Sequence, residues 1–436
     1  MAIQFLGERT PQAVTSGPPR PRVYLDSAAT TLMAEPVNRV MQRYLASGWY
    51  SNPHSELTTP SRVTAEVIAE ARGLLARLVD APEGHVVVFG GSGATEPLNI
   101  LSVALFCEGS VRDTVVVTPQ EHHSNLLPWM RAASRLIVSP LNNDGSLDLE
   151  VFEKILLAEG KRIRLVAVTA ISNVTGVRNP ISEIARIAHR VGAEVVVDAT
   201  QAVAHVPLSM RTLGIDYLVA SGHKMYAPGT PGWMVIPSTM PCDRWEPGNV
   251  GGGTVDAVWM DKASVKFKSS IIDRLEGGTV NIPGIVGLGA AAQMLMQQGL
   301  RQIQDHEQVL MTRMRDGLEA IGGVATYGPG DRVGILAFNI EGFTFDQVAS
   351  ALNDYFAISV RAGAFCAHPY VRDLLDGQTG RLGMVRASLG MYTTIEDIDA
   401  FLAAVRWIVA NREKVVTPRE PPAGEFSITK EMSDGS

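Results

Sequence analysis

Val195-Val196-Val197-Asp198 and Ser221-Gly222-His223-Lys224 are the two stretches of sequence that decide the fold. The first is an apolar, β-branched run bounded by turn residues, which is typical of a strand buried in a parallel sheet, and it ends in an acid. The apolar run at 215–220 predicts another strand, which leads into the second stretch. Because ligands of open α/β sheets bind at the carboxyl ends of the strands, we expect Asp198 and Lys224 to lie at one ligand site.

The pairing of an acid with a lysine at such a site suggests a particular chemistry. A lysine can form a Schiff base with an aldehyde, and an acid can keep a pyridinium nitrogen protonated, which together are what pyridoxal phosphate chemistry requires. Each residue alone has a simpler interpretation, since a lysine after Gly-His is commonly a solvated loop residue and an acid at a strand end is commonly a helix N-cap. The functional interpretation therefore depends on the rest of the chain.

Length, charge and cysteine content exclude several classes of protein. The 436 residues are too many for one ordinary domain, so two or three are expected. The net charge of −7, without a basic cluster, argues against a nucleic acid as the main partner. We find no apolar run of about 18 residues that would span a membrane, and no apolar core of a signal peptide. The three widely spaced cysteines form neither a metal-binding pair nor a disulfide framework, which favours a reducing, cytoplasmic location.

Strand and helix patterns alternate regularly from about residue 85 to residue 236. This alternation predicts a mostly parallel sheet with helices on both faces. The expected strands occupy 85–89, 115–117, 137–138, 164–168, 195–198, 215–220 and 232–236, and the last of them is a candidate for antiparallel pairing. Residues 240–285 break the pattern, and helical spacing at 283–296 and 301–321 predicts helices that link two domains.

A second, smaller α/β unit is predicted after the linker helices. Its expected strands are 333–338, 358–361 and 384–389, and Thr394 and Asp397 are spaced like a capping box at the start of its last helix. We therefore expect a flexible arm over 1–22, a large cofactor-binding domain over 23–285, a small C-terminal domain over 286–414 with the N-terminal segment packed on it, and a disordered tail over 415–436.

The segment 90–96, Gly-Gly-Ser-Gly-Ala-Thr-Glu, joins the strand at 85–89 to an apolar helix. A strand, a glycine-rich turn and a helix form a geometry that binds phosphate, because free backbone N–H groups and the helix dipole point toward the anion. Thr95 can add a hydroxyl. Glycine-rich turns of this kind are common, so the motif alone is a weak signal.

Nine motifs in order give the chain its resemblance to a known family. They are Tyr24-Leu25-Asp26-Ser27-Ala28-Ala29-Thr30, Gly93-Ala94-Thr95-Glu96, Glu121-His122-His123-Ser124-Asn125, Ser172-Asn173-Val174-Thr175-Gly176, Val197-Asp198-Ala199-Thr200-Gln201-Ala202, Ser221-Gly222-His223-Lys224, Gly277-Gly278-Thr279, Arg361-Ala362-Gly363-Ala364-Phe365-Cys366-Ala367 and Val385-Arg386-Ala387-Ser388-Leu389. Over residues 23–410 the chain resembles the cysteine desulfurases and selenocysteine lyases of the class V aminotransferase fold, in the branch with an Arg-x-Gly-x-x-Cys-Ala motif. The resemblance implies the α/β fold of type I pyridoxal phosphate-dependent transferases, with a mostly parallel seven-stranded sheet in the large domain and a smaller C-terminal α/β domain.

The same resemblance implies which residues hold the cofactor, pyridoxal 5′-phosphate. Lys224 would bind it covalently and move the Cα proton of the substrate, Asp198 would pair with the ring nitrogen, Gln201 would donate to the phenolic oxygen, and His122 would stack on the ring as a further catalytic residue. The phosphate would be held by four residues of this chain, namely Ala94, Thr95, Ser221 and His223, of which Ala94 can offer only its backbone. Thr279 would reach the phosphate of the neighbouring subunit in a homodimer. The neighbouring His123 fits the family less specifically and is left as a structural residue.

The substrate site is implied in the same way. Arg386 would bind the carboxylate of L-cysteine in bidentate fashion, with help from Asn173. Arg361 could favour the thiolate of Cys366 or contact the carboxylate, and an ordinary structural role is equally compatible with its position. Cys366 would attack the substrate sulfur as a thiolate, because only a thiolate is a strong nucleophile, and would keep it as a persulfide.

The resemblance thus predicts a cytoplasmic cysteine desulfurase that converts L-cysteine to L-alanine and passes sulfur to an acceptor protein. Three alternatives stay open: a selenocysteine lyase, another class V reaction such as epimerisation, β-lysis or transamination in which Cys366 takes no part, and a scaffold protein without cofactor. The loop 226–232 and the stretch 376–380 depart from the family pattern and could alter access to Cys366. The sequence gives no role for Cys107 or Cys242 and does not identify the sulfur acceptor.

Overall fold

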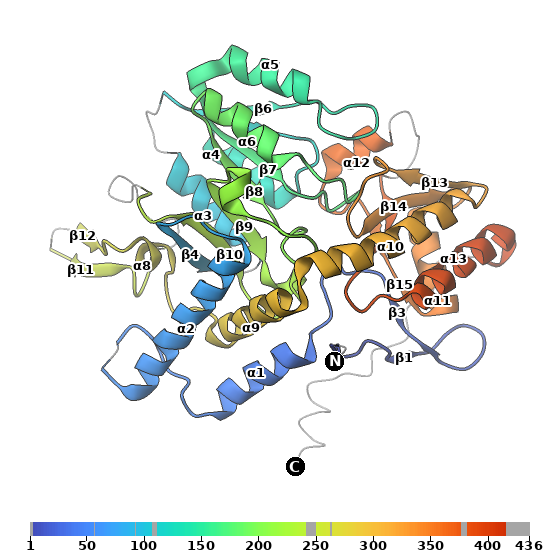
Figure 1. Ribbon diagram of the computed structural model, residues 1–436, viewed down its shortest axis with the longest axis horizontal. Coiled ribbons are helices and arrows are strands. Elements are labelled where there is room, and N and C mark those ends of the chain that lie inside the picture. The colour runs from blue at the N-terminus through green and yellow to red at the C-terminus, as the bar shows by residue number, and fades with distance from the viewer. Residues whose placement is uncertain are drawn as a thin grey trace.

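The protein consists of two α/β units that lie side by side, the larger one containing the N-terminal helices and the smaller one the C-terminal strands (Figure 1). The structure, a computed structural model, describes residues 3–55, 57–91, 93–106, 111–240, 250–261, 264–375 and 382–415. Cys107, Cys242, the stretch 376–380 and nearly all of the predicted tail lie outside the described residues. Among the described residues, no helix combines the length and the hydrophobicity that a membrane crossing requires.

A seven-stranded sheet forms the centre of the large unit. Its strands, in spatial order, are β4 (His85–Gly90), β10 (Gly232–Pro237), β9 (Tyr217–Ser221), β8 (Glu194–Asp198), β7 (Ile163–Thr169), β5 (Thr114–Val117) and β6 (Arg135–Val138). β10 is antiparallel to both of its neighbours, and the remaining strand pairs are parallel. The predicted mostly parallel sheet of seven strands is therefore confirmed. The carboxyl ends of β5, β7, β8 and β9 lie along one edge, where a ligand of this fold binds.

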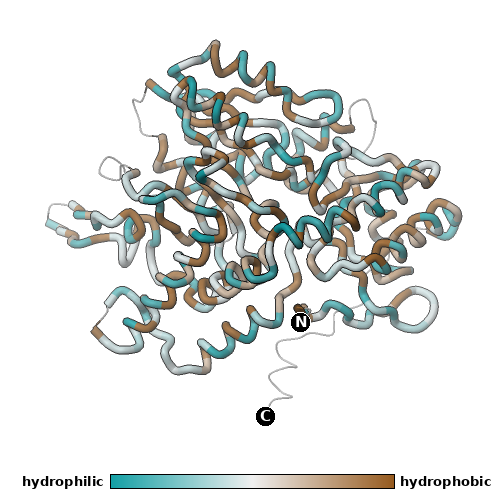
Figure 2. Tube along the Cα trace, viewed as in Figure 1, coloured by the Kyte–Doolittle hydropathy of each residue, from teal (hydrophilic) through white to brown (hydrophobic). Residues whose placement is uncertain are grey.

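The central strands are buried on both faces, which is why they read as continuous apolar runs. Val195 and Val197 of β8 belong to one hydrophobic core, whereas Val196 between them belongs to another on the opposite face. The hydropathy of the chain follows this arrangement, with apolar residues gathered on the inner strands and polar residues on the outer helices (Figure 2).

Helices cover both faces of the sheet. One face carries α1 (Glu35–Ala46), α2 (Thr59–Leu78), α5 (Leu149–Glu159), α6 (Ile181–Arg190), α7 (Met210–Leu213) and α9 (Ile282–Gln298), and the other carries α3 (Thr95–Leu105), α4 (Leu127–Ala132) and α8 (Ile271–Leu275). Short 3-10 turns follow two of the strands, η1 (His123–Asn125) after β5 and η3 (Gly222–Lys224) after β9. Two more, η2 (Gly160–Arg162) and η4 (Arg412–Lys414), follow α5 and α13 (Ile395–Ala410).

The small unit is built on an antiparallel sheet of four strands. Their order is β13 (Val324–Tyr327), β14 (Ile335–Ile340), β17 (Met384–Ser388) and β16 (Arg361–Gly363), and the helices around them are α10 (Leu300–Glu319), α11 (Phe345–Phe356), α12 (His368–Leu374) and α13 (Ile395–Ala410). The predicted capping box of α13 is confirmed: Thr394 Oγ1 accepts from the Asp397 N–H, and Asp397 Oδ2 accepts from the Thr394 N–H.

The contacts divide the chain at a different point from the predicted boundary between residues 285 and 286. Leu295 and the rest of the buried face of α9 belong to the core of the large unit, whereas Leu310 and Leu318 of α10 belong to the core of the small unit. Ile303 of α10 still belongs to the core of the large unit, so the two cores change within α10, between Ile303 and Leu310. β3 (Val23–Tyr24) pairs in parallel with β15 (Ile358–Ser359), so the N-terminal segment packs on the small unit.

Two segments have more structure than their sequence indicates. Within the predicted flexible arm, Phe5 is buried in the large core, and β1 (Pro11–Gln12) pairs with β2 (Arg20–Pro21). A hairpin of β11 (Val255–Trp259) and β12 (Ser264–Phe267) extends from the large unit in the region where no strand was predicted (Figure 1). The hairpin is held by local pairing, and the arm also by long-range contacts such as the bond from Thr15 N–H to the Asp354 carbonyl, so neither segment has a long apolar run that periodicity could reveal.

Candidate active site

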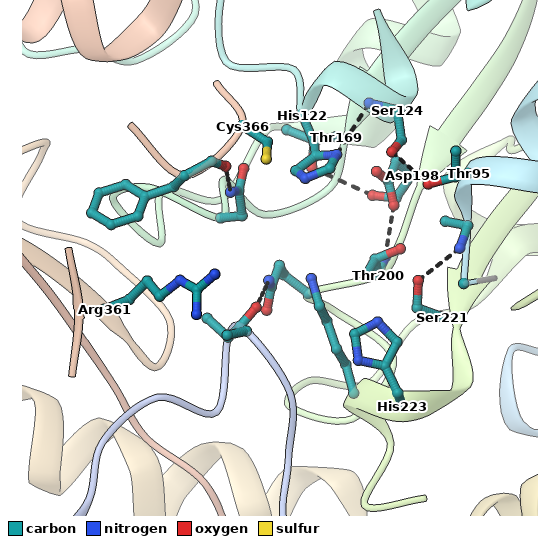
Figure 3. A pocket seen from close by; sticks show the side chains of 18 of the residues that line it. Thr95, His122, Ser124, Thr169, Asp198, Thr200, Ser221, His223, Arg361 and Cys366 are labelled. Atoms are coloured by element: carbon teal, nitrogen blue, oxygen red, sulfur yellow. Dashed lines mark hydrogen bonds between the residues drawn. The ribbon is translucent and has the colours of Figure 1, made fainter. Parts of the chain in front are cut away.

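A cavity of about 500 Å³ lies at the carboxyl ends of the central strands and is lined by residues of both units. It brings together every site residue predicted from the sequence except Thr279. These residues are Ala94, Thr95, His122, Asn173, Asp198, Gln201, Ser221, His223, Lys224, Arg361, Cys366 and Arg386. Figure 3 shows them converging from several segments, with Cys366 beside His122 and with Ser221 and His223 farther along the cavity.

Lys224 is the last residue of η3, so the short turn after β9 directs its side chain into the cavity. Burial, together with the positive charge of Arg386, lowers the pKa of this amine to about 8, although Asp198 and Asp26 act in the opposite direction. A substantial fraction of the amine is therefore unprotonated near neutral pH. An unprotonated amine can act as a nucleophile toward a carbonyl or as a base.

Asp198 ends β8 and is almost completely buried in the floor of the cavity. Burial raises the pKa of its carboxyl group, and hydrogen bonding to Thr200 and the charge of Lys224 reduce the shift. The Thr200 N–H donates to Asp198 Oδ1 over 3.0 Å. A buried carboxylate of this kind favours a cationic partner inside the cavity, because an opposite charge offsets the cost of its desolvation.

Gln201 presents an unpaired oxygen at the same place. Its Nε2 donates to the Ala28 carbonyl over 2.9 Å, whereas its Oε1 is buried and has no hydrogen-bond partner among the described residues. Buried polar atoms are almost always hydrogen-bonded, so an orphaned acceptor in the wall of a cavity indicates a donor on a bound group. A neighbouring residue, Thr200, also lines the cavity and was not singled out from the sequence.

The glycine-rich turn and the start of α3 form a cradle at one end of the cavity. Gly93 has a φ of +58°, and a Cβ placed on it would lie 3.0 Å from Ser221 Oγ. The Ala94 N–H donates to Ser221 Oγ over 2.8 Å, and no side chain caps α3 at Ala94. Thr95 Oγ1 is within 2.8 Å of Ser124 Oγ. Uncapped N–H groups of this helix terminus and two hydroxyl groups are thus available to an anion.

The two cavity histidines are held in the neutral form. Burial and the charge of Lys224 lower the pKa of both His122 and His223 to about 4. His122 Nδ1 accepts from the Ser124 N–H over 3.1 Å, which fixes its ring orientation (Figure 3). Ser124 was overlooked in the sequence, although its position two residues after His122 is the usual place for such a contact.

The two arginines lie side by side because of strand register. Arg361 of β16 is directly opposite Arg386 of β17, so both side chains leave the same face of the small sheet. Arg386 is buried, which lowers its pKa to about 10, and its guanidinium donates to the Asn173 carbonyl over 2.8 Å and to Asp26 Oδ1 over 3.4 Å. Arg386 Nε is buried and has no partner among the described residues. Arg361 is exposed and points into the cavity (Figure 3).

Cys366 lies on the segment 364–367, here called the Cys366 loop, which joins β16 to α12. Its side chain is exposed at the cavity. Phe365 and Cys366 have φ angles of +51° and +54°, a left-handed conformation that costs about 1–2 kcal/mol for each residue with a side chain. The Phe365 carbonyl accepts from Asn173 Nδ2 over 2.8 Å, and its ring lies 4.8 Å from the guanidinium carbon of Arg386. The loop and the arginine site are therefore in direct contact.

Asn173 differs from expectation in its surroundings, and Thr279 lies away from the cavity of its own chain. The Asn173 side chain faces the Cys366 loop, and only its backbone carbonyl contacts Arg386. Thr279 is exposed outside the cavity, where its Oγ1 accepts from Asn52 Nδ2 over 3.1 Å. Asp26 and Phe365, which contact Arg386, lie inside quoted motifs, yet nothing in the sequence indicated that they meet this side chain.

The chain is similar to known proteins over most of its length. The profile of the family described as aminotransferase class-V matches residues 23–401. A cysteine desulfurase of Klebsiella pneumoniae is 35% identical over 394 residues, which covers 89% of this chain and 94% of that protein. The apo structure of a cysteine desulfurase from Thermococcus onnurineus superimposes with a TM-score of 0.80 at 33% identity, covering 89% of this chain and 95% of the other. The cysteine desulfurase CsdA of Escherichia coli gives a TM-score of 0.78 at 29% identity, with the same coverage of both chains.

Proposed function

The chain belongs to the aminotransferase class V family, and on this premise we propose that it is a cysteine desulfurase that converts L-cysteine to L-alanine and retains the sulfur as a persulfide on Cys366. One observation carries the proposal. Cys366 lines the same cavity as Lys224, Asp198 and Arg386, so a thiol, an amine, an acid and a carboxylate-binding group all face one small ligand. A cavity of about 500 Å³ has room for a cofactor and an amino acid together.

The family implies pyridoxal 5′-phosphate, and the lining residues fit this group. Asp198 would pair with the ring nitrogen, the second N–H of Gln201 Nε2 would donate to the phenolic oxygen, and Lys224 would hold the aldehyde carbon. The neutral ring of His122 offers a flat face for stacking. When bound, the cofactor supplies an aldehyde that captures the amino group of the substrate and a ring that withdraws electrons from Cα.

The phosphate would lie in the cradle at the start of α3. Ala94, Thr95, Ser221 and His223 surround this end of the cavity, and their donors include backbone N–H groups, two hydroxyls and an imidazole. Because the pKa of His223 is lowered to about 4, this imidazole would contribute a hydrogen bond rather than a full charge. The helix terminus then supplies the positive end of a dipole.

The substrate carboxylate would bind to the paired arginines. Arg386 has one buried N–H, at Nε, without a partner among the described residues, and Arg361 projects into the cavity beside it. Guanidinium groups bind carboxylates in bidentate fashion, which would fix the orientation of the amino acid. With the carboxylate held there, the amine of Lys224 would take the proton from Cα of the substrate.

Cys366 would then attack the substrate sulfur as a thiolate. An S–S bond forms to Cys366, the Cβ–S bond of the substrate breaks, and the electron pair of that bond stays with the carbon skeleton, which takes up protons to become alanine. The exposed position of Cys366 supports transfer of the bound sulfur to an acceptor protein. We also infer a homodimer, in which the exposed Thr279 would serve the phosphate site of the neighbouring subunit, and a cytoplasmic location.

Incubation of the cofactor-loaded protein with L-cysteine tests the proposal. We expect stoichiometric release of alanine before any acceptor is added, and we expect Cys366→Ala to reduce this release by at least about 100-fold. Cys107→Ala and Cys242→Ala are matched controls that should retain the activity. If Cys366→Ala released alanine at the wild-type rate, Cys366 would not be the sulfur acceptor, and a wild-type protein that formed other products from L-cysteine would belong to another class V reaction.

A further inference from the structure

The conformation of the Cys366 loop depends on contacts from outside it. Phe365 and Cys366 both have positive φ angles, and residues with side chains keep this conformation only where surrounding contacts hold them. The Ala367 N–H donates to the Ala364 carbonyl over 2.9 Å, which closes a turn but does not attach the loop to the large unit. The position of the Cys366 sulfur therefore depends on the residues that contact the loop from the large unit.

His123 contacts this segment on both sides of Cys366. Its backbone N–H donates to the Cys366 carbonyl over 2.7 Å. Its Nε2 accepts from the backbone N–H of His368 over 3.3 Å, and the two imidazole rings meet edge to face with centroids 4.6 Å apart. His368 begins α12 directly after the loop. One residue of the large unit thus holds the chain immediately before and after Ala367.

Asn173 of the large unit also contacts the loop, since its Nδ2 donates to the Phe365 carbonyl. Asn173 lines the cavity, so a change there would alter the substrate site as well as the loop. His123 does not line the cavity and follows the cofactor-stacking candidate His122 by one residue. It is therefore the contact through which the position of the loop can be changed without altering the lining.

We propose that His123 is a positioning residue that holds the Cys366 loop so that the thiol is in reach of the substrate sulfur. This inference rests on the proposed function. The hydrogen bond requires an unprotonated Nε2, since an N–H at this atom cannot accept from His368. Burial, together with the charge of His368, lowers the pKa of His123 and so favours the neutral ring.

Steady-state kinetics of His123→Ala with L-cysteine test this role. The variant keeps the backbone N–H but loses the acceptor and the ring contact. We expect kcat to fall by about five- to tenfold, the effect of one hydrogen bond of ordinary strength, while KM stays within about twofold. His123→Gln, whose amide oxygen can replace Nε2, should recover most of kcat. A fall in kcat without rescue by glutamine, or a change confined to KM, would contradict the proposal.

Alkylation of Cys366 by iodoacetamide, followed on its own peptide by mass spectrometry, gives a second measurement that does not need turnover. We expect the alkylation rate to change in His123→Ala and to return toward the wild-type value in His123→Gln. His189→Ala is the matched control, because His189 is a partly exposed histidine of α6 whose hydrogen bond to Asp216 lies outside the cavity. His123→Leu, which keeps the volume but cannot accept, replaces His123→Ala if that variant does not fold.

The two proposals fail in different ways. If the wild-type protein releases no alanine from L-cysteine, the proposed function is wrong, whatever His123 does. If the wild-type protein is active and His123→Ala matches it in kcat and in alkylation rate, the desulfurase assignment stands and the positioning role of His123 is refuted.

Discussion

Lys224 owes its reactivity to its surroundings rather than to its sequence neighbours. A cavity that limits hydration and an arginine from the other unit both favour the neutral amine, and two carboxyl groups limit the shift. The sequence placed Lys224 at a strand end through the motif Ser-Gly-His-Lys, but Arg386 is distant in the chain, so its effect on the lysine could not be predicted. The lowered pKa of Lys224 is therefore a property of the folded arrangement and not of the motif alone.

The lowered pKa of Lys224 predicts how cofactor attachment depends on pH. Only the neutral amine attacks an aldehyde, so the initial rate at which the apoprotein binds pyridoxal phosphate should rise with pH and level off above about 8, instead of rising toward the ordinary lysine value of 10.5. The visible absorbance of the lysine-bound cofactor follows this rate. A rate that still increases steeply between about pH 9 and 10 would show an unshifted lysine.

Arg386 and Arg361 should contribute unequally to substrate binding. Arg386 is buried with an unpaired Nε, whereas Arg361 is exposed. Arg386→Lys removes the planar fork, so we expect KM for L-cysteine to increase at least about tenfold, against about two- to threefold for Arg361→Lys. Arg313→Lys, at an exposed ion pair with Asp399, is the control and should leave KM unchanged. Equal KM values for Arg386→Lys and the wild type would remove Arg386 from the carboxylate site.

Residue roles were predictable only where a motif carried them. Eight of the nine motifs contain residues that line the cavity, and several of these, such as Asp198 and Lys224, lie at or just after a strand end. They did not reveal that Asp26 contacts Arg386 or that Phe365 lies over its guanidinium, since those contacts join segments more than 20 residues apart. Pairwise contacts of this kind depend on tertiary packing that periodicity does not encode.

At the scale of single elements, the start of α3 is the clearest case of function built from backbone geometry. Gly93 adopts a positive φ, Ala94 leaves the helix without a side-chain cap, and Ser221 from β9 accepts its N–H. The strand–glycine turn–helix pattern was visible in the sequence. The contribution of Ser221 was implied only by the resemblance, because β4 and β9 are brought together by β10 between them.

Ser221→Ala should weaken the cradle. The change removes the acceptor of the Ala94 N–H and a hydroxyl that faces the cavity, so we expect the dissociation constant of pyridoxal phosphate to rise about five- to tenfold. Ser209→Ala is the matched control: Ser209 caps α7, and its loss should cost about 1 kcal/mol of stability without affecting cofactor binding. Equilibrium dialysis measures both variants. Cofactor binding that is unchanged in Ser221→Ala would separate this hydroxyl from the phosphate site.

Elements with a strong apolar period were predicted well, and exposed ones were not. The central strands of the large sheet are buried on both faces, and their Val-rich runs stand out in the sequence. β11 and β12 form an exposed hairpin in which Trp259 and Val265 remain partly open to solvent, so the expected alternation of buried and exposed residues is weak there. Without a buried face, a strand has little hydrophobic signal.

At the scale of the whole molecule, a buried pair joins the two units. His205, in the segment after β8, lies 2.9 Å from Glu307 of α10, and both side chains are almost fully buried. Burial lowers the pKa of His205, but Glu307 outweighs this and the net shift is upward. Gly334, directly before β14, leaves space beside this pair, since a Cβ there would lie 3.2 Å from Glu307 Oε2.

Glu307→Gln should destabilise the protein in a pH-dependent way. Because the pKa of His205 is raised in the folded state, the ion pair contributes fully below about pH 6.5 and loses its contribution as pH rises through the folded pKa. We expect a loss of about 2 kcal/mol at about pH 6 and a smaller loss at about pH 9, measured by urea unfolding. Glu319→Gln, on the exposed face of the same helix, should have little effect at either pH. An equal loss for Glu307→Gln at both pH values would argue against a charged His205.

The boundary between the units could not be located from the sequence. α9 is small and apolar on all sides, so its composition is compatible with either core. Its position is set by close approach: a Cβ on Gly287 would lie 2.4 Å from Met41 Sδ, and one on Gly289 would lie 2.9 Å from the Ala71 Cβ. These contacts with α1 and α2 assign α9 to the large unit, and they are visible only in the folded chain.

The most direct test of the desulfurase assignment is a single turnover of the cofactor-loaded protein with L-cysteine that carries a heavy sulfur isotope. Peptide mass spectrometry should find the labelled sulfur on Cys366, as an added mass of about 32 Da plus the isotope difference, together with one equivalent of alanine. Borohydride reduction of a parallel sample that has received no substrate should leave the pyridoxyl group on Lys224. Alanine formation with no sulfur on Cys366, or a cofactor attached to another lysine, would contradict the account.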